Sequence, residues 1–383
     1  MGYPRNRYDL AEFGGAFGDL GTLIPFVAAY ISIVKMDPGG ILLAFGSALV
    51  AVGFFYRTPF PVQPMKAIGA AAITQTGQFA ALTSSTVVAA GVVTGLIWLV
   101  LSATGLAHRL AHWIPRPALL GVVMGLGFSF MLEGIRMMAQ SPWVGAGLLV
   151  LTLVMLARSR FPAMVVLVVI GAAIALNDQP SLLAELAAIR LSARLPLFAW
   201  PTLSWNDLWV GAVFLALPQL PLTFGNALIS ITEENNLLFP DRPVTEQRVA
   251  FSTCLLNLWS SAMGGIPMCH GAGGMAGHVQ FGARTGGASI ILGAVLIAVL
   301  IAVGLFLADS VAVLFRLFPP GVLGVILFLA GVQLAVGSKE TGTDKVDRFV
   351  VLTTAAFAIW NVGIAVVFGF LAFNASKRGW LKI

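Results

Sequence analysis

A lysine and three prolines interrupt an otherwise apolar run, PFPVQPMKAIGAAAI, that begins at Pro59. Proline breaks the interior of a helix and a lysine at bilayer depth is costly, so both residue types need a reason to be there. If a helix starts inside the membrane with Pro64 as its first residue and Gln63 as its cap, its first amides and its dipole form a site for an anion. The free amides would be those of Met65, Lys66 and Ala67. A lysine charge in the first turn opposes the dipole and becomes favourable beside a bound anion.

The second half of the chain carries a related interruption, GGIPMCHGAGG, in which Pro267 precedes Cys269, His270, Gly271 and Gly273. Small residues let backbone amides approach a ligand closely. Two such helix starts that face each other, together with the lysine, are predicted to form a pocket for a small dianion. The other predicted substrate contacts are uncharged donors, Thr22 in the first half and Thr223 and Asn226 in the second.

Structural interpretations of the same residues stay open. The prolines would also fit kinks whose gaps are filled by neighbouring side chains. Lys66 would also fit an ion pair with Asp19 or Glu133, and His270 would fit a hydrogen-bonded packing residue. Glu12 and Asp19 are seven residues apart, so they share one face of the first predicted helix. If transport is coupled to protons, the predicted carriers are Asp19, Glu12 and His270.

Adjacent Cys269 and His270 raise the question of a zinc site, which takes four ligands. The other histidines, His108, His112 and His278, fall in predicted loops or at span ends away from this pair. We therefore expect no metal and no other cofactor. The chain contains no Gly-x-Ser-x-Gly, His-Glu-x-x-His, Walker or Rossmann pattern, so no enzyme activity is predicted.

The composition places these residues in a membrane. Of the 383 residues, 58% are hydrophobic and only 10% are charged, and the mean hydropathy is +0.93. A soluble domain carries about 25% charged residues. Apolar runs such as ASIILGAVLIAVLIAVGLFLA are long enough to cross a bilayer as helices. The chain is predicted to be an all-α polytopic membrane protein, and the net charge of +6 is better explained by topology than by nucleic acid.

We expect about fourteen spans, near residues 12–34, 40–56, 62–78, 86–106, 117–135, 143–157, 161–176, 206–232, 247–262, 267–281, 286–307, 319–337, 348–360 and 362–375, of which the last two could be one span broken at Asn361. With fourteen spans both termini lie on the same side. If that side is the cytoplasm, it holds sixteen lysines and arginines against five outside, as the positive-inside rule requires. The predicted location is the plasma (inner) membrane, multi-pass, with both termini cytoplasmic.

Three proline-containing segments recur in the same order in the two halves of the chain. Their prolines are Pro25, Pro61 and Pro117 in the first half and Pro221, Pro267 and Pro320 in the second. Each half holds seven predicted spans, and because seven is odd the second copy enters from the opposite side. This predicts an inverted repeat, which is typical of secondary transporters. The predicted parts are a first repeat (1–176), an extracytoplasmic linker with an amphipathic surface helix (177–205) and a second repeat (206–383).

The segments FGGAFGDLGTLIPF, RTPFPVQPMKAI and GGIPMCHGAGG followed by FGARTGG resemble the sulfate/molybdate transporter family of the sulfate permease superfamily. The resemblance covers almost the whole chain. It implies a seven-plus-seven inverted repeat with broken third and tenth helices, a core domain that binds the substrate between them, and a gate domain. By resemblance one binding motif is formed by Gln63, Pro64, Met65 and Lys66, and the other by Cys269, His270, Gly271 and Gly273. Typical sulfate permeases carry a cytoplasmic C-terminal regulatory domain, which is expected to be absent here because the chain ends shortly after its last predicted span, as in the molybdate branch. Members of the superfamily often form dimers, so a homodimer is an expected partner state.

The function expected from these features is secondary active transport of a tetrahedral oxyanion, molybdate before sulfate, by an elevator-like motion. Uptake of a dianion into a negative cell costs about 2.3 kcal/mol per charge per 100 mV, so coupling to protons is plausible. The alternatives are a sulfate or general oxyanion carrier and an anion channel on the same fold. A nucleobase or bicarbonate carrier is a further alternative, although Lys66 with two helix starts suits a dianion better.

Overall fold

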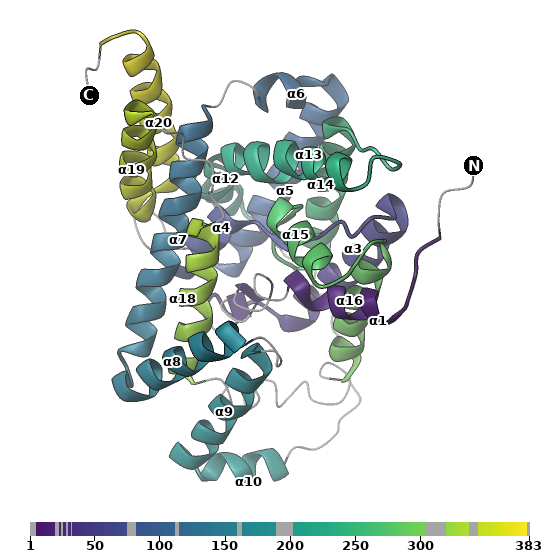
Figure 1. Cartoon of the computed structure of the whole chain (residues 1–383), viewed down its shortest axis with the longest axis vertical. Helices are drawn as coiled ribbons and strands as arrows, with labels where there is room; N and C mark the ends of the chain where they lie inside the picture. The colour runs from purple at the N-terminus through teal and green to yellow at the C-terminus, as the bar shows by residue number, and fades with distance from the viewer. Residues whose placement is uncertain are drawn as a thin grey trace.

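The computed structural model describes residues 5–19, 23, 26–27, 30–31, 33–74, 82–111, 115–158, 163–188, 202–302, 319–336 and 344–380. Apart from two short strands, its regular elements are helices (Figure 1). In the first half they are α1 (Leu10–Ala16), η1 (Phe17–Asp19), α3 (Pro38–Tyr56), β1 (Gln63–Pro64), α4 (Lys66–Thr74), α5 (Ser84–Thr104), α6 (Leu106–Ala111), α7 (Arg116–Met138), α8 (Pro142–Arg158), α9 (Ala163–Asp178) and α10 (Ser181–Ala187). In the second they are α11 (Trp205–Val210), η2 (Gly211–Ala216), α12 (Leu217–Leu222), η3 (Thr223–Ser230), α13 (Ile231–Leu238), α14 (Glu246–Ala262), β2 (Met268–Cys269), α15 (Ala272–Gln280), α16 (Gly287–Leu300), α18 (Pro320–Val336), α19 (Lys345–Trp360) and α20 (Val362–Lys377).

The segments from α11 to α13 form one continuous helical stretch, Trp205–Leu238, in agreement with the span predicted over 206–232. Within it, η2 and η3 are π-helical and flank α12, which contains Pro221. A proline inside a helix removes one backbone donor and pushes away the preceding turn, and a wider turn accommodates both effects. The side chains of this stretch are therefore turned relative to those of a regular helix.

Four of the described helices are long and apolar enough to cross a membrane, namely α3, α5, α7 and the stretch Trp205–Leu238. Shorter apolar helices lie in α8, α9, α16, α18 and α20. The predicted number of fourteen spans is not tested by these lengths. The last two predicted spans are separate helices, because α19 ends at Trp360 and the Asn361 side chain accepts a hydrogen bond from the Ile364 amide at the start of α20. The two helices lie side by side in Figure 1.

Antiparallel pairs of helices connect the two halves of the chain. α3 packs along α16, α5 along α14, and α7 along α18. Where α7 crosses α18, a Cβ atom at Gly127 would lie 2.6 Å from the Gly331 carbonyl oxygen, and one at Gly331 would lie 2.5 Å from the Gly127 carbonyl oxygen. Only glycine permits this approach, which brings the two backbones into direct contact. Because α3 and α14 are the second spans of the predicted halves and α5 and α16 the fourth, the pairs α3–α16 and α14–α5 are equivalent, as an inverted repeat requires.

The third and tenth spans are broken, as predicted. Each begins with a two-residue strand, and β1 pairs with β2 in antiparallel register, Gln63 opposite Cys269 and Pro64 opposite Met268. The short helices α4 and α15 start directly after these strands. One detail of the prediction is wrong, because Pro64 lies in the strand and the helix begins two residues later at Lys66. The pairing with β2 keeps this segment extended and delays the helix.

Candidate functional site

Side chains from neighbouring helices hold the paired strands β1 and β2, called the crossing strands below, in place. Asn257 of α14 accepts a hydrogen bond from the Met268 amide (3.1 Å) and donates one to the Met268 carbonyl oxygen (2.7 Å). Ser289 donates to the Phe60 carbonyl oxygen, and Ser260 donates to the Ile266 carbonyl oxygen. Extended backbone at membrane depth must find such partners inside the protein. Sequence reasoning missed Asn257, whose only signal in the sequence was an amide side chain within a predicted span.

His270 is part of this support. Its side chain is fully buried, its Nδ1 atom lies 2.8 Å from the Pro61 carbonyl oxygen, and its Nε2 atom lies 2.7 Å from the Ser252 hydroxyl. Since the carbonyl can only accept, Nδ1 donates and Nε2 accepts from Ser252 in a neutral ring. The rings of Tyr56 and Phe60 pack against the imidazole with centroids 5.7 and 4.8 Å away. In this conformation both nitrogens of His270 are bonded within the protein.

The first turn of α4 is capped by a residue of the other half. Gln219 of α12 accepts hydrogen bonds from the Ala67 amide (2.8 Å) and the Ile68 amide (3.3 Å) through its Oε1 atom. Its Nε2 atom donates to the Thr223 hydroxyl, which fixes the orientation of the amide. The Met65 amide donates to the Pro267 carbonyl oxygen (2.9 Å). The expectation that Gln63 caps α4 and that the Met65 and Ala67 amides are free is therefore wrong, because the Pro267 carbonyl oxygen and Gln219 bind them.

The first turn of α15 differs from that of α4. Its N-cap is Gly271, which provides no side-chain cap. A Cβ atom at Gly271 would lie 2.1 Å from Oε1 of Gln63 and 3.4 Å from Nδ2 of Asn226, so both amide side chains lie beside the start of this helix. Asn226 is half-buried, and its side chain makes no hydrogen bond to another residue in the part of the chain that the structure describes. Gly273 is exposed, and a Cβ atom there would contact nothing within 4 Å.

The start of α15 presents hydrogen-bond donors to a ligand that can accept them. Gly274 and Met275 donate their amides to the Gly271 carbonyl oxygen. The amides of Ala272 and Gly273, the first two residues of α15, have no acceptor within the helix. The partial positive charge of a helix N-terminus, an asparagine amide and a nearby lysine favour a small anion. The half-buried Lys66 is the first residue of α4, directly after Met65, whose amide donates to the Pro267 carbonyl oxygen.

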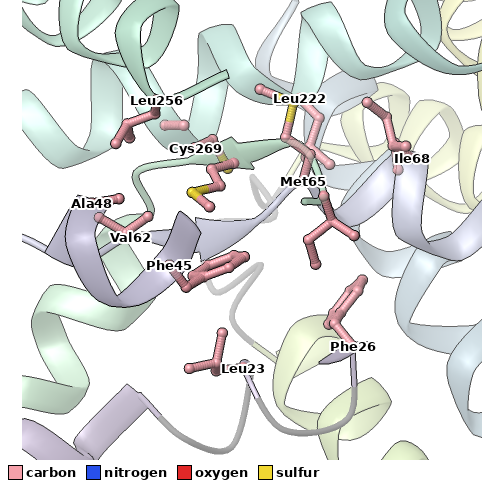
Figure 2. Packing of buried hydrophobic residues seen from close by; sticks show 14 of the residues in the cluster. Leu23, Phe26, Phe45, Ala48, Val62, Met65, Ile68, Leu222, Leu256 and Cys269 are labelled. Carbon is pink, nitrogen blue, oxygen red and sulfur yellow. The ribbon is translucent and has the colours of Figure 1, made fainter. Parts of the chain in front are cut away.

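The other predicted contact residues have different environments. The side chains of Met65 and Cys269 are buried in the hydrophobic core, where Figure 2 shows Cys269 on β2 and Met65, the residue after β1, near Leu222 and Ile68. Gln63 and Thr223 are buried, and Thr223 bonds to Gln219. Thr22 lies outside the described residues. The structure therefore brings Gln63, Gly271 and Asn226 together around the start of α15.

Glu12 is held in place by backbone amides. The carboxylate is fully buried and accepts hydrogen bonds from three backbone amides, those of Arg284 (3.0 Å), Thr285 (2.9 Å) and Ala288 (3.1 Å). These amides surround the start of α16, where a negative charge is favourable. Glu12 thus ties the first helix to α16.

The other acidic residues singled out from the sequence are Glu133 and Asp19. Glu133 pairs with Arg136 on α7 at 3.2 Å. The side chain of Asp19 lies outside the described part of the structure. Within the described ranges, no group of three histidine, cysteine, aspartate or glutamate residues comes together as metal ligands would.

Comparisons with known proteins identify the family. A family model described as "Molybdate transporter of MFS superfamily" matches residues 11–130 and 211–334, one stretch in each predicted half. Molybdate transporter 2 of Arabidopsis thaliana is 32% identical over 96% of this chain and 88% of its own. Molybdate transporter 1 of Chlamydomonas reinhardtii is 29% identical over 95% of this chain and 91% of its own. All are named as transporters and not as enzymes.

The fold is shared with solved anion transporters. The transmembrane domain of the cyanobacterial bicarbonate transporter BicA superposes with a TM-score of 0.62 over 97% of this chain and 98% of its own, at 15% identity. The inward-facing state of the murine anion transporter Slc26a9 superposes with a TM-score of 0.70 over 100% of this chain and 70% of its own, at 12% identity. At these identities the likeness concerns the fold alone. The chain belongs to the molybdate transporter family and is a multi-pass membrane anion transporter with the fold of the bicarbonate and Slc26 transporters.

Proposed function

We propose that this chain is a secondary transporter that carries a tetrahedral oxyanion, molybdate before sulfate, through the plasma membrane. The observation that carries the proposal is the start of α15, where an asparagine amide without a protein partner among the described residues lies beside a helix N-terminus without a side-chain cap. The family relatives are named for molybdate, which is the anion proposed here. Sulfate has the same charge and shape, so the transport assay must separate the two.

The chemistry of the site suits a dianion. A tetrahedral oxyanion has acceptors only, and it needs several donors in place of its water shell. The first amides of α15 and the Nδ2 atom of Asn226 are donors, and Lys66 brings a formal positive charge to the start of α4. Hydrogen bonds to a charged group contribute about 1.5–3 kcal/mol each. Because the Gln219 oxygen already occupies the first turn of α4, the proposed anion contacts α15 by backbone and α4 only through Lys66.

The proposed movement is an elevator-like alternating access. The crossing strands, α4 and α15 would move together as one core, because hydrogen bonds from α12 and α14 bind them to each other. The closely packed α7 and α18 would belong to the gate. We further propose the repeat boundaries 1–176 and 206–383, cytoplasmic termini and a homodimer. The positive-inside count supports the orientation of the termini.

Uptake into sealed liposomes tests this proposal. Purified protein is reconstituted, and internal molybdenum is measured by mass spectrometry with and without a large excess of sulfate. We expect saturable molybdate uptake that survives sulfate and falls at least tenfold in Lys66→Ala, the loss of about one charge-assisted contact. Lys345→Ala, at the start of α19, is the control and should transport normally. Competition by sulfate at equal concentration would indicate a general oxyanion carrier, ionic conductance far above carrier rates would indicate a channel, and no uptake of either anion would refute the proposal.

A further inference from the structure

His278 has one ring nitrogen without a hydrogen-bond partner. The residue lies in the last turn of α15, its side chain is fully buried, and its Nδ1 atom is 2.8 Å from the Gly15 carbonyl oxygen. Because a carbonyl oxygen can only accept, Nδ1 carries the hydrogen and the neutral ring leaves a lone pair on Nε2. That atom is buried and has no partner in the part of the protein that the structure describes. An imidazole fixed in one tautomer with an unused lone pair can accept a proton there.

His278 differs in this respect from the histidine of the crossing strands. His270 is equally buried, but its Nε2 atom already pairs with the Ser252 hydroxyl at 2.7 Å. Glu12 is bonded to three backbone amides at the start of α16. Of these three buried residues, only His278 has a basic site that is not already used.

The position of His278 connects it to the proposed anion site. Both belong to the nine-residue helix α15, with the anion site at its first turn and His278 in its last. At about 1.5 Å per residue, His278 lies about 8 Å along the helix axis from Gly273. An anion at the N-terminus and a positive charge near the C-terminus are each favourable to the same helix dipole. They also attract each other directly across this distance.

We propose that Nε2 of His278 binds the proton that accompanies the oxyanion, so that anion binding and protonation favour each other through α15. This inference rests on the proposed function, because it names the coupling ion of the same anion site. At a separation of about 10 Å and an effective dielectric constant of about 20, the attraction between one positive charge and a dianion corresponds to roughly a 300-fold change in affinity. By linkage, protonation raises molybdate affinity by the same factor by which molybdate raises proton affinity.

The charged groups on the elements packed against α15 contribute to the electrostatic potential at His278. On α1 the acidic group is Glu12, which is bonded to the start of α16; η1 ends at Asp19, whose side chain is not described. On α13, Glu233 is exposed and Glu234 is half-buried, and η3 carries no titratable residue. The exposed Arg284 donates to the Val279 carbonyl oxygen at 3.1 Å. This cation opposes a charge on His278, but water screens it.

Proton uptake measured on the purified full chain tests the proposal. Molybdate is added in weakly buffered detergent solution at pH values between about 6 and 8, and an indicator dye reports protons taken up. We expect uptake of up to one proton per bound molybdate, and an affinity for molybdate that falls by up to about a hundredfold as the pH rises through these two units. His278→Gln, which keeps a donor for Gly15 but cannot take up this proton, should bind molybdate at all pH values with the high-pH affinity of the wild type. His108→Gln, on α6, is the matched control and should behave as the wild type.

The outcomes separate this inference from the proposed function. Molybdate binding by the wild type without proton uptake overturns the inference alone, and so does a His278→Gln protein that keeps the proton uptake and the pH dependence. If His278→Gln misfolds and binds no molybdate at any pH, the proton uptake of the wild type on molybdate binding is the test. Uptake supports the inference, and its absence overturns it. A wild-type protein that binds neither molybdate nor sulfate overturns the proposed function, and this inference with it.

Discussion

Replacement of Asn226 tests whether the start of α15 binds an oxyanion. Its Nδ2 atom lies 3.4 Å from where a Cβ atom of Gly271 would be, and its side chain makes no hydrogen bond to any other described residue. Asn226→Ala should therefore change the unfolding free energy by less than about 0.5 kcal/mol, as expected where no bond is broken. The same change removes one donor to a dianion, about 1.5–3 kcal/mol, so molybdate affinity should fall roughly 10- to 150-fold.

Asn226→Asp makes the test sharper because it keeps the size of the side chain and replaces the donor by a negative charge. At about 4 Å and an effective dielectric constant of about 20, two unit charges repel by about 4 kcal/mol, and molybdate carries two. Binding measured by calorimetry in detergent should then be undetectable, while thermal unfolding stays near that of the wild type.

The control for both variants is Asn374→Ala on α20, a half-buried asparagine whose side chain donates to the Phe370 carbonyl oxygen of its own helix. It should bind molybdate normally. Wild-type molybdate affinity in Asn226→Asp would refute the reasoning, because no dianion could then lie beside this residue.

Two further predictions concern stability. Gln219→Met leaves the Ala67 and Ile68 amides without their acceptor, so it should lower the unfolding free energy by about 2–3 kcal/mol, seen as a lower midpoint of thermal unfolding in detergent. An unchanged midpoint would show that Gln219 does not hold the start of α4. Glu12→Gln removes the charge that three amides at the start of α16 bind, and should cost about 1–3 kcal/mol in the same measurement. A Glu12→Gln protein as stable as the wild type would contradict the capping role of this carboxylate.

The broken helices could be predicted from sequence because their signals are local. Proline followed by small residues inside an apolar run excludes a regular helix, and the same pattern in both halves predicted two such breaks. The resemblance to the sulfate/molybdate transporter family added the fold and the same two motifs, and the family model and relatives confirm that resemblance. The helix that starts at Lys66 instead of Pro64 marks the limit of this reasoning, because strand pairing with a distant segment decided it.

The contacts that depend on residues distant in sequence could not be predicted. Gln219 caps α4 across a separation of about 150 residues, and Asn257 binds β2 from the neighbouring helix. Both are amide side chains within predicted spans, and their sequence neighbours do not show which backbone they reach. Glu12 was interpreted as a possible proton carrier because a buried carboxylate is costly. Its three amide partners become visible only when α16 is placed beside α1.

The most direct test of the proposed anion site is a structure of the protein with bound molybdate, in which molybdenum is located by its anomalous scattering. We predict one peak within hydrogen-bond distance of the first amides of α15 and of Nδ2 of Asn226, on the side of α4 where Lys66 begins the helix. A molybdenum peak elsewhere in the membrane region, with the start of α15 empty, would contradict the central claim that this helix end holds the transported anion.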